Sequence, residues 1–222
     1  MEGLPLIIVV GYDFNNALDA WRHRAWQISC GFIVLIGLAL FAIRAYIKSL
    51  CQGEELFKLA TIDSLTGILN RRFLFETGMQ EVNRINRYGG CLSILILDID
   101  HFKKVNDTWG HSSGDRVIQV MAQTISNCLR NIDMVGRIGG EEFVILLLET
   151  DKDKALFVAE RVRLAIQNTT KATNDDGKSI HFTASIGLLT VIVGETFQDA
   201  LGRADSALYK AKESGRNRVV VS

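Results

Sequence analysis

The stretch RIGGEEFVILLLE, residues 137–149, places two glycines and two glutamates directly before a strongly apolar run. A tight turn between two strands favours positive φ, which glycine adopts without steric cost, so Gly139–Gly140 is expected to form the turn of a hairpin. The apolar residues 143–148 then form its second strand. Charged residues beside a core strand need a reason, and Glu141 and Glu142 are therefore candidates for a functional site.

A second strand that ends in acidic residues supports this interpretation. The segment SILILDID, residues 93–100, is expected to be a buried strand ending in Asp98 and Asp100. If both strand ends meet at one edge of the sheet, their carboxylates repel unless a divalent cation or a proton separates them. Such oxygen ligands suit Mg²⁺, and a pair of these ions promotes phosphoryl or nucleotidyl transfer. For any single acid, helix capping or solvation remains the alternative.

The remaining pattern between residues 63 and 222 predicts alternating strands and helices. Helices are expected over 70–88, 115–129 and 152–168 and from Phe197 to about Ala211, and strands over 133–138, 181–191 and 218–221. Without the first helix and the last strand, this order is β-α-β-β-α-β. It predicts an α+β fold, a ferredoxin-like or palm-type sheet with packed helices.

An apolar segment lies near the N-terminus. No formal charge occurs from Ala25 to Ile43, and as a helix these residues would span about 28 Å, enough to cross a bilayer. We expect a transmembrane helix over 25–47; a signal peptide and a buried soluble helix are the alternatives. Trp21, Trp26 and Tyr46 bracket the segment as interfacial aromatic residues do. The distribution of lysine and arginine only weakly places the C-terminal side in the cytoplasm.

The flanks of this segment suggest two further regions. Residues 2–13, EGLPLIIVVGYD, resemble a lone β-strand, which is not stable by itself. We therefore interpret 1–24 as the C-terminal remnant of an extracytoplasmic sensor, in a chain that is a fragment or the product of a truncated gene. Residues 44–61 have helical character, and 48–62 are expected to form a connecting signalling helix.

Composition excludes some classes of partner and site. Twenty-five basic and twenty-five acidic residues cancel, so no overall positive field points to nucleic acid, and none is expected as a partner. The four cysteines, Cys30, Cys51, Cys91 and Cys128, have no CxxC spacing, which argues against a zinc site or a disulfide framework.

From Asp63 to about Val220 the sequence resembles the GGDEF-domain family of diguanylate cyclases, with the signature in its GGEEF form at 139–143. The resemblance covers several ordered motifs: DSLTGILNRR at 63–72, DIDHFKKVND at 98–107, GHSSGD at 110–115, RIGGEEF at 137–143, TASIG at 183–187 and ADSALYKAKESGRNRV at 204–219.

The resemblance implies roles for individual residues. The implied catalytic residues are Asp98, Glu141 and Glu142, and the implied metal ligands are Asp98, the carbonyl of Ile99, and Glu141. Asn106 and Asp115 would recognise guanine, since an amide and a carboxylate complement its edge. Phosphate contacts would come from Phe102 and Lys103, through a loop, and from Lys212 and Arg216.

Ordinary structural roles remain open for several of these residues. Asn106 is also a typical turn residue in an Asn-Asp pair, and Asp115 would suit the N-terminus of a helix. Cations in the last turn of a helix before Gly215, such as Lys212, are common without any ligand.

The implied reaction condenses two GTP molecules into cyclic di-GMP and releases two pyrophosphates. One domain holds one GTP, so a homodimer is implied, and the implied cofactor is Mg²⁺, two ions per active site, with Mn²⁺ as a substitute. Because GTP is cytoplasmic, the catalytic domain is expected in the cytoplasm of a bacterium, anchored by a single pass through the inner membrane.

A second site is implied upstream of the signature. Arg130 and Asp133 form an RxxD motif, and Arg161 matches a supporting arginine, so the product cyclic di-GMP is expected to bind there and inhibit. A surface ion pair is the alternative for RxxD. A non-catalytic cyclic di-GMP receptor, an inactive truncated remnant and an enzyme making a different purine nucleotide remain rival interpretations of the whole chain.

Overall fold

The computed structural model describes residues 14–169 and 172–222 and divides the chain into two units, one ending at Leu56 and one comprising Phe57–Ser222. The strand predicted for residues 2–13 lies outside the described residues. Helix α1 (Phe14–Thr61) is continuous, so the segments predicted as a transmembrane helix and a connecting helix belong to one helix. Residues 14–24, assigned above to a sensor remnant, are also part of it.

Helix α1 contains the apolar segment noted in the sequence. Trp21–Lys48 is long and apolar enough to cross a membrane by length and composition, and it includes all of 25–47. Its apolar side chains are exposed, for example Phe32, Leu35 and Phe41 at 60%, 63% and 73%. Exposed apolar surface of this extent is typical of a segment that contacts a membrane or another protein.

The second unit is built on one six-stranded sheet with the order β1-β3-β4-β2-β5-β6. Its strands are β1 (Leu69–Asn70), β2 (Leu92–Ile99), β3 (Met134–Gly139), β4 (Glu142–Leu148), β5 (Ala184–Thr190) and β6 (Val219–Val221). The four central strands are antiparallel, and β1 and β6 add parallel pairs at the two edges. The predicted ferredoxin-like α+β arrangement is confirmed. The two-residue strand β1 was not predicted, because Asn70 was assigned to the following helix.

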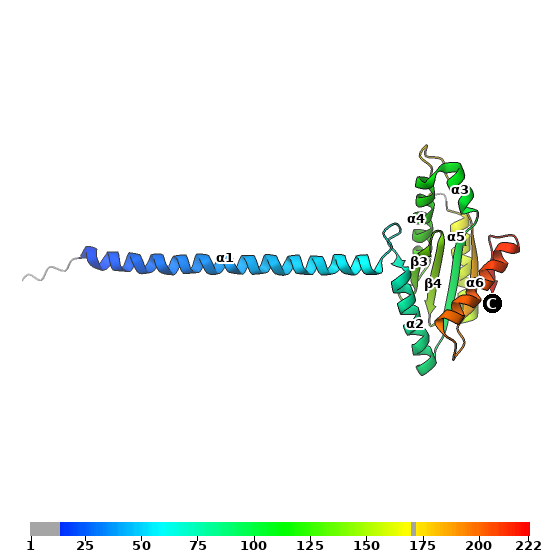
Figure 1. Ribbon diagram of the computed structural model, residues 1–222, viewed down its shortest axis with the longest axis horizontal. Coiled ribbons are helices and arrows are strands. Elements are labelled where there is room, and N and C mark those ends of the chain that lie inside the picture. Colours follow the sequence, from blue (N-terminus) through cyan, green and yellow to red (C-terminus); the bar gives the residue numbers. More distant parts are fainter. Residues whose placement is uncertain (1–13, 170–171) are drawn as a thin grey trace, which may run out of the picture. The chain divides into compact units, whose positions relative to one another are not determined.

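Helices cover both faces of this sheet (Figure 1). They are α2 (Arg71–Tyr88), α3 (Phe102–Trp109), α4 (His111–Asn127), α5 (Lys152–Gln167) and α6 (Phe197–Glu213). Every residue of β2 is buried, and alternate side chains enter two cores: Leu95 and Leu97 pack with α4 and α5, whereas Ile94 and Ile96 pack with α2 and α6. Because side chains alternate along a strand, Asp98 projects toward the same face as Ile96, where α6 lies.

Two predictions about local structure were wrong. Phe102 and Lys103 were placed on a loop, but they begin α3, which follows His101 in a left-handed conformation at φ 57°. Helix α4 was expected to start at Asp115, but it begins at His111 and includes the GHSSGD motif. Neither helix has a side-chain cap at its start, so the usual sequence signal for a helix N-terminus is missing.

Candidate active site

The two acidic strand ends meet, as the sequence predicted. Asp98 of β2 pairs directly with Glu142 of β4, and on its other side it pairs with Ser185 of β5. Opposed residues on antiparallel strands project from the same face of the sheet, so the two carboxylates lie side by side. Asp98 is only 7% exposed, whereas Glu141 and Glu142 are half-buried.

The hairpin turn lies one residue later than predicted. Gly139 pairs with Glu142, so the turn consists of Gly140 and Glu141, and only Gly140 has a left-handed φ, of 41°. A side chain at Gly140 would be strained in this conformation, which explains the second glycine of the signature. The turn thus presents Glu141 at its tip, adjacent to the Asp98–Glu142 pair.

An arginine anchors this turn to the start of the domain. Arg137 donates from Nε to the carbonyl of Gly140 at 2.8 Å, and its guanidinium lies 3.3 Å from a carboxylate oxygen of Asp63. Asp63 also accepts from the backbone N–H and the hydroxyl of Thr66. Burial raises the pKa of Asp63, but the hydrogen bonds from Thr66 and the charge of Arg137 outweigh burial and lower it.

Lys212 of α6 reaches the acidic cluster. Its ammonium nitrogen lies 2.8 Å from a carboxylate oxygen of Asp98. Burial raises the pKa of Asp98, the Lys212 hydrogen bond and charge lower it, and Glu141 and Glu142 raise it, with a net increase. Even with Lys212 beside it, burial and the two glutamates keep the pKa of Asp98 above its ordinary value, so a further cation at this site would favour its charged form.

Asp100 has a different environment from Asp98. Its two carboxylate oxygens accept hydrogen bonds from the hydroxyls of Thr183 and Ser185, at 2.7 and 2.6 Å, and from the backbone N–H of Asn217 at 3.0 Å. These contacts fasten the end of β2 to β5 and to the turn after α6. The expectation that Asp100 joins the acidic cluster is not supported, because its oxygens are already engaged.

The acidic residues suit Mg²⁺ by the chemistry of their donors, since carboxylate and carbonyl oxygens are hard ligands. Asp98, Glu141 and Glu142 supply carboxylates, and Ile99 ends β2 beside them. Among the described residues no three acidic, cysteine or histidine side chains converge tightly enough to hold an ion unaided. Magnesium commonly completes its coordination with water and substrate phosphates, so it needs few ligands from the protein.

The predicted guanine-binding residues lie on two adjacent helices, α3 and α4. The side-chain oxygen of Asn106 is buried and has no hydrogen-bond partner in the described structure. A Cβ added at Gly114 would overlap that oxygen and would approach the ring of Phe102 to 3.2 Å. Asp115, the next residue of α4, is exposed, as is Lys103 on α3. A buried acceptor without a partner is costly and requires an explanation such as a ligand.

The two other predicted phosphate ligands lie at the end of α6. Lys212 is in its last turn, and Arg216 follows in a left-handed conformation at φ 62°. Arg216 is exposed, and its guanidinium has no ion pair within the described part of the chain. Its backbone N–H donates to Ala211, which holds the turn against the helix end.

The RxxD residues lie on the surface at the end of α4. Asp133 accepts from the backbone N–H of Arg130 at 3.0 Å, while its other carboxylate oxygen is buried and unpaired within the described structure. Arg161 of α5 donates to the carbonyl of Cys128 at 2.6 Å and lies over the ring of Phe157. No ion pair joins the Arg130 and Asp133 side chains in the described residues, so the alternative of a surface ion pair is not what the structure contains.

Three contacts at this site were not predicted from the sequence. The Asp98–Lys212 ion pair, the Arg137–Asp63 pair and the packing of Asn106 on Gly114 all join residues from different elements. All six residues lie within the motifs quoted for the family resemblance, but spacing alone does not indicate which of them touch.

Comparisons with known proteins agree with this arrangement. Residues 60–218 match the family described as diguanylate cyclase, GGDEF domain. Diguanylate cyclase A of Treponema denticola is 40% identical over 175 residues, which are 77% of this chain and 47% of that protein. The probable diguanylate cyclase DgcT of Escherichia coli is 40% identical over 225 residues, which are 99% of this chain and 49% of that protein. The chain thus spans about half the length of these two relatives.

Solved structures give the same result. The coiled coil and GGDEF domain of DgcB from Caulobacter crescentus, in complex with c-di-GMP, has a TM-score of 0.77 at 28% identity, covering 84% of this chain and 99% of that one. The active GGEEF domain of a diguanylate cyclase from Vibrio cholerae has a TM-score of 0.63 at 33% identity, covering 68% of this chain and 96% of that one. With the family match over most of its length and the paired acidic strand ends, this chain belongs to the diguanylate cyclase GGDEF-domain family.

Proposed function

We propose that this chain condenses two GTP molecules into cyclic di-GMP and releases two pyrophosphates. The observation that carries this proposal is the direct pairing of Asp98 with Glu142, next to Glu141 at the tip of the hairpin. In each half-reaction a 3′-hydroxyl attacks the α-phosphorus of the other nucleotide; a phosphodiester bond forms, the α–β phosphoanhydride bond breaks, and the hydroxyl proton passes to solvent. The names of the two curated relatives support the same activity.

Asp98, Glu141 and the carbonyl of Ile99 would hold Mg²⁺, two ions per active site, with Mn²⁺ as a substitute. When bound, these ions would lower the pKa of the attacking hydroxyl and neutralise charge on the leaving oxygen. Glu142 adds negative charge beside Asp98 and so favours cation binding. The half-buried position of the cluster strengthens this attraction relative to bulk water.

The rest of the site would bind and orient GTP. Asn106 would direct its buried oxygen to a guanine N–H, which supplies the partner that this atom lacks, and Asp115 would accept from the same edge. Lys212 and Arg216 would bind phosphate oxygens. The first turn of α3 contains Phe102 and Lys103, and its backbone N–H groups would also bind phosphate oxygens, because a helix N-terminus attracts anions.

Catalysis would require two facing subunits, since one domain would bind one GTP. Helix α1 would place the domains at high local concentration by crossing the bacterial inner membrane once, with the catalytic domain in the cytoplasm. Its apolar segment Trp21–Lys48 supports this anchoring. The related DgcB structure combines a coiled coil with a GGDEF domain, which is consistent with helix-mediated pairing.

Cyclic di-GMP would also inhibit the enzyme through Arg130, Asp133 and Arg161. The unpaired buried oxygen of Asp133 would accept from guanine N–H groups, and the exposed Arg130 guanidinium would supply a forked donor. Arg161 already lies at the carbonyl of Cys128, two residues before Arg130.

The direct test is incubation of the purified chain, in detergent, with GTP and Mg²⁺, followed by chromatography of the products. We expect cyclic di-GMP and pyrophosphate in a ratio of about one to two, which is the balance of the proposed nucleotidyl transfer. Absence of product together with tight cyclic di-GMP binding would favour a non-catalytic receptor. An artificially dimerised chain that regained turnover would instead identify an enzyme whose subunits fail to pair.

A further inference from the structure

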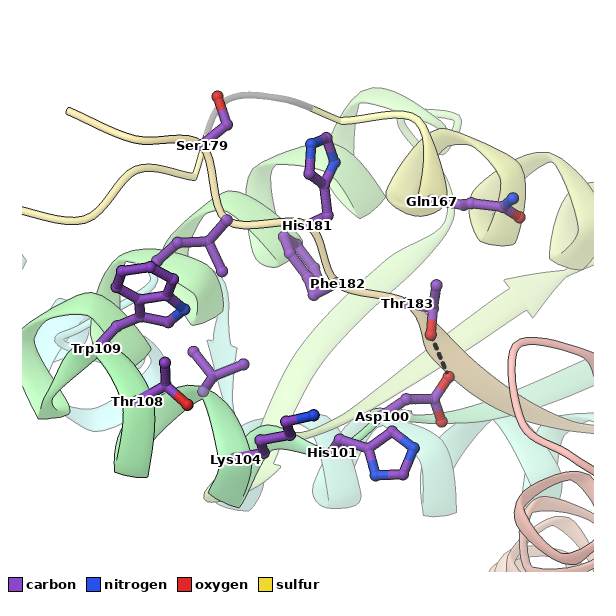
Figure 2. A pocket seen from close by; sticks show the side chains of 12 residues that line it. Asp100, His101, Lys104, Thr108, Trp109, Gln167, Ser179, His181, Phe182 and Thr183 are labelled. Atoms are coloured by element: carbon purple, nitrogen blue, oxygen red, sulfur yellow. Dashed lines mark hydrogen bonds between the residues drawn. The ribbon is translucent and has the colours of Figure 1, made fainter.

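A cavity lies beside α3, away from Asn106. It has a volume of about 620 Å³ and opens between α3, the end of α5 and residues 179–183 (Figure 2). This volume is in the range of small-molecule sites. The α3 residues that line it, at positions 104, 105, 108 and 109, fall on one helical stripe that continues from His101 before the helix, whereas Asn106 packs toward Gly114 of α4. The cavity is therefore distinct from the candidate guanine site.

Three exposed side chains in the wall of this cavity carry N–H donors, beside the hydroxyls of Thr108 and Ser179. Lys104, His101 and His181 line it, and none of the three side chains has a hydrogen bond or ion pair within the described part of the chain. The one carboxylate in the lining is Asp100, whose oxygens are already engaged by Thr183 and its other partners. Positive charge and N–H donors that lack partners favour an anion.

The cavity walls are apolar and aromatic. Trp109 remains 39% exposed, and Phe182 and Ile180 form the floor beside Val105. Figure 2 shows Lys104, Thr108 and Trp109 on α3 facing residues 179–183 across the space. An inorganic anion would leave these walls in contact with water, whereas a flat ring would cover them and place its charge near Lys104.

We propose that this cavity is a binding site for a small anionic molecule with an aromatic ring system, separate from the nucleotide sites. Lys104 supplies the ion pair, the two imidazoles supply hydrogen bonds, and Trp109 with Phe182 encloses the ring. The proposal concerns binding alone and stands or falls independently of cyclase activity.

The experiment uses the full chain in lipid nanodiscs and naphthalene-2-sulfonate as the probe. Binding is measured by equilibrium dialysis, with empty nanodiscs subtracted and with excess cyclic di-GMP and a non-hydrolysable GTP analogue present to fill the nucleotide sites. We expect a single saturable site. Lys104→Gln should weaken binding by about tenfold, the loss of one charge-assisted contact. Lys210→Gln, an exposed residue of α6 outside the cavity, should bind as the wild type does.

A second variant tests the cavity itself. Thr108→Trp fills the space while keeping the charge of Lys104, and it should abolish binding. Its melting curve shows whether it folds. Absence of saturable binding by the wild-type chain would overturn the proposal. Equal binding by the wild type and Lys104→Gln would overturn it as well, whatever the result for Thr108→Trp.

Discussion

Asp98 of β2 and Glu142 of β4 are direct cross-strand partners at the end of the sheet. Like charges in this position destabilise a strand pair, and Asp98 is also buried, with 7% of its surface exposed. Lys212 offsets the repulsion with an ion pair of 2.8 Å. The fold therefore concentrates negative charge where a divalent cation would bind, with one lysine as the counterion in the protein itself.

Lys212 should compete with metal for Asp98. In Lys212→Met, Mn²⁺ affinity without nucleotide should rise about fivefold, because the variant loses both a competing partner and a repelling charge. Affinity for a non-hydrolysable GTP analogue should fall, because a phosphate ligand is lost. Electron paramagnetic resonance of free Mn²⁺ and a nucleotide titration measure the two effects. Lys210→Met on the same helix is the control. Weaker Mn²⁺ binding by Lys212→Met than by the wild type would contradict this competition and would mean that Lys212 supports the metal site.

The contact between Gly114 and Asn106 should control GTP affinity. In Gly114→Ala the new Cβ would push the Asn106 oxygen from its position, so the KM for GTP should rise about tenfold with a smaller change in kcat. Gly202→Ala is the matched control, since a Cβ there meets nothing within 4 Å. Steady-state kinetics of both variants make the comparison. An unchanged KM in Gly114→Ala would remove Asn106 from the guanine site.

Product inhibition should depend on the RxxD motif. Arg130→Ala should leave the initial rate unchanged and raise the inhibitory concentration of cyclic di-GMP at least about tenfold, the loss of a forked charged contact. Arg87→Ala, an exposed arginine at the end of α2, serves as the control. Initial rates at increasing product concentration measure the effect. Identical inhibition curves for Arg130→Ala and the wild type would refute the assignment.

The Asp63–Arg137 contact should make stability depend on pH in the acidic range. The folded-state pKa of Asp63 is lowered from 3.8, so its contribution is complete above the unfolded-state value and is lost as pH falls through the lower folded-state value. Asp63→Asn should therefore be less stable than the wild type at neutral pH, and this difference should shrink below about pH 4. Urea unfolding at several pH values tests this. A difference that stays constant down to pH 3, about one unit below the ordinary value, would contradict it.

Local patterns predicted the elements whose signals are continuous in the sequence. The apolar runs of β2 and β4 and their acidic residues predicted two strand ends that meet at one edge of the sheet. The register confirms that they meet, and it adds that Asp98 pairs with Glu142. Helix α3 was missed because it has only 8 residues and begins after a left-handed His101 that provides no side-chain cap.

Contacts between distant segments could not be predicted in the same way. Asp100 was grouped with Asp98 because both end one strand, yet its carboxylate binds the backbone of Asn217, 117 residues away. Arg137 reaches Asp63 across 74 residues. Such pairs depend on how the sheet and helices pack. The partners of each carboxylate are therefore set by the tertiary structure and not by its position in a motif.

The most direct test of the central claim compares the rate of cyclic di-GMP formation by the Glu141→Gln variant with the rate of the Glu149→Gln variant. Both changes remove one carboxylate, at the hairpin tip and at the other end of β4, where Glu149 is exposed. If the hairpin carboxylates hold the catalytic ions, Glu141→Gln should lose at least about 100-fold in rate, whereas Glu149→Gln should match the wild type. Near-normal turnover by a folded Glu141→Gln variant would contradict a nucleotidyl-transfer site at this end of the sheet.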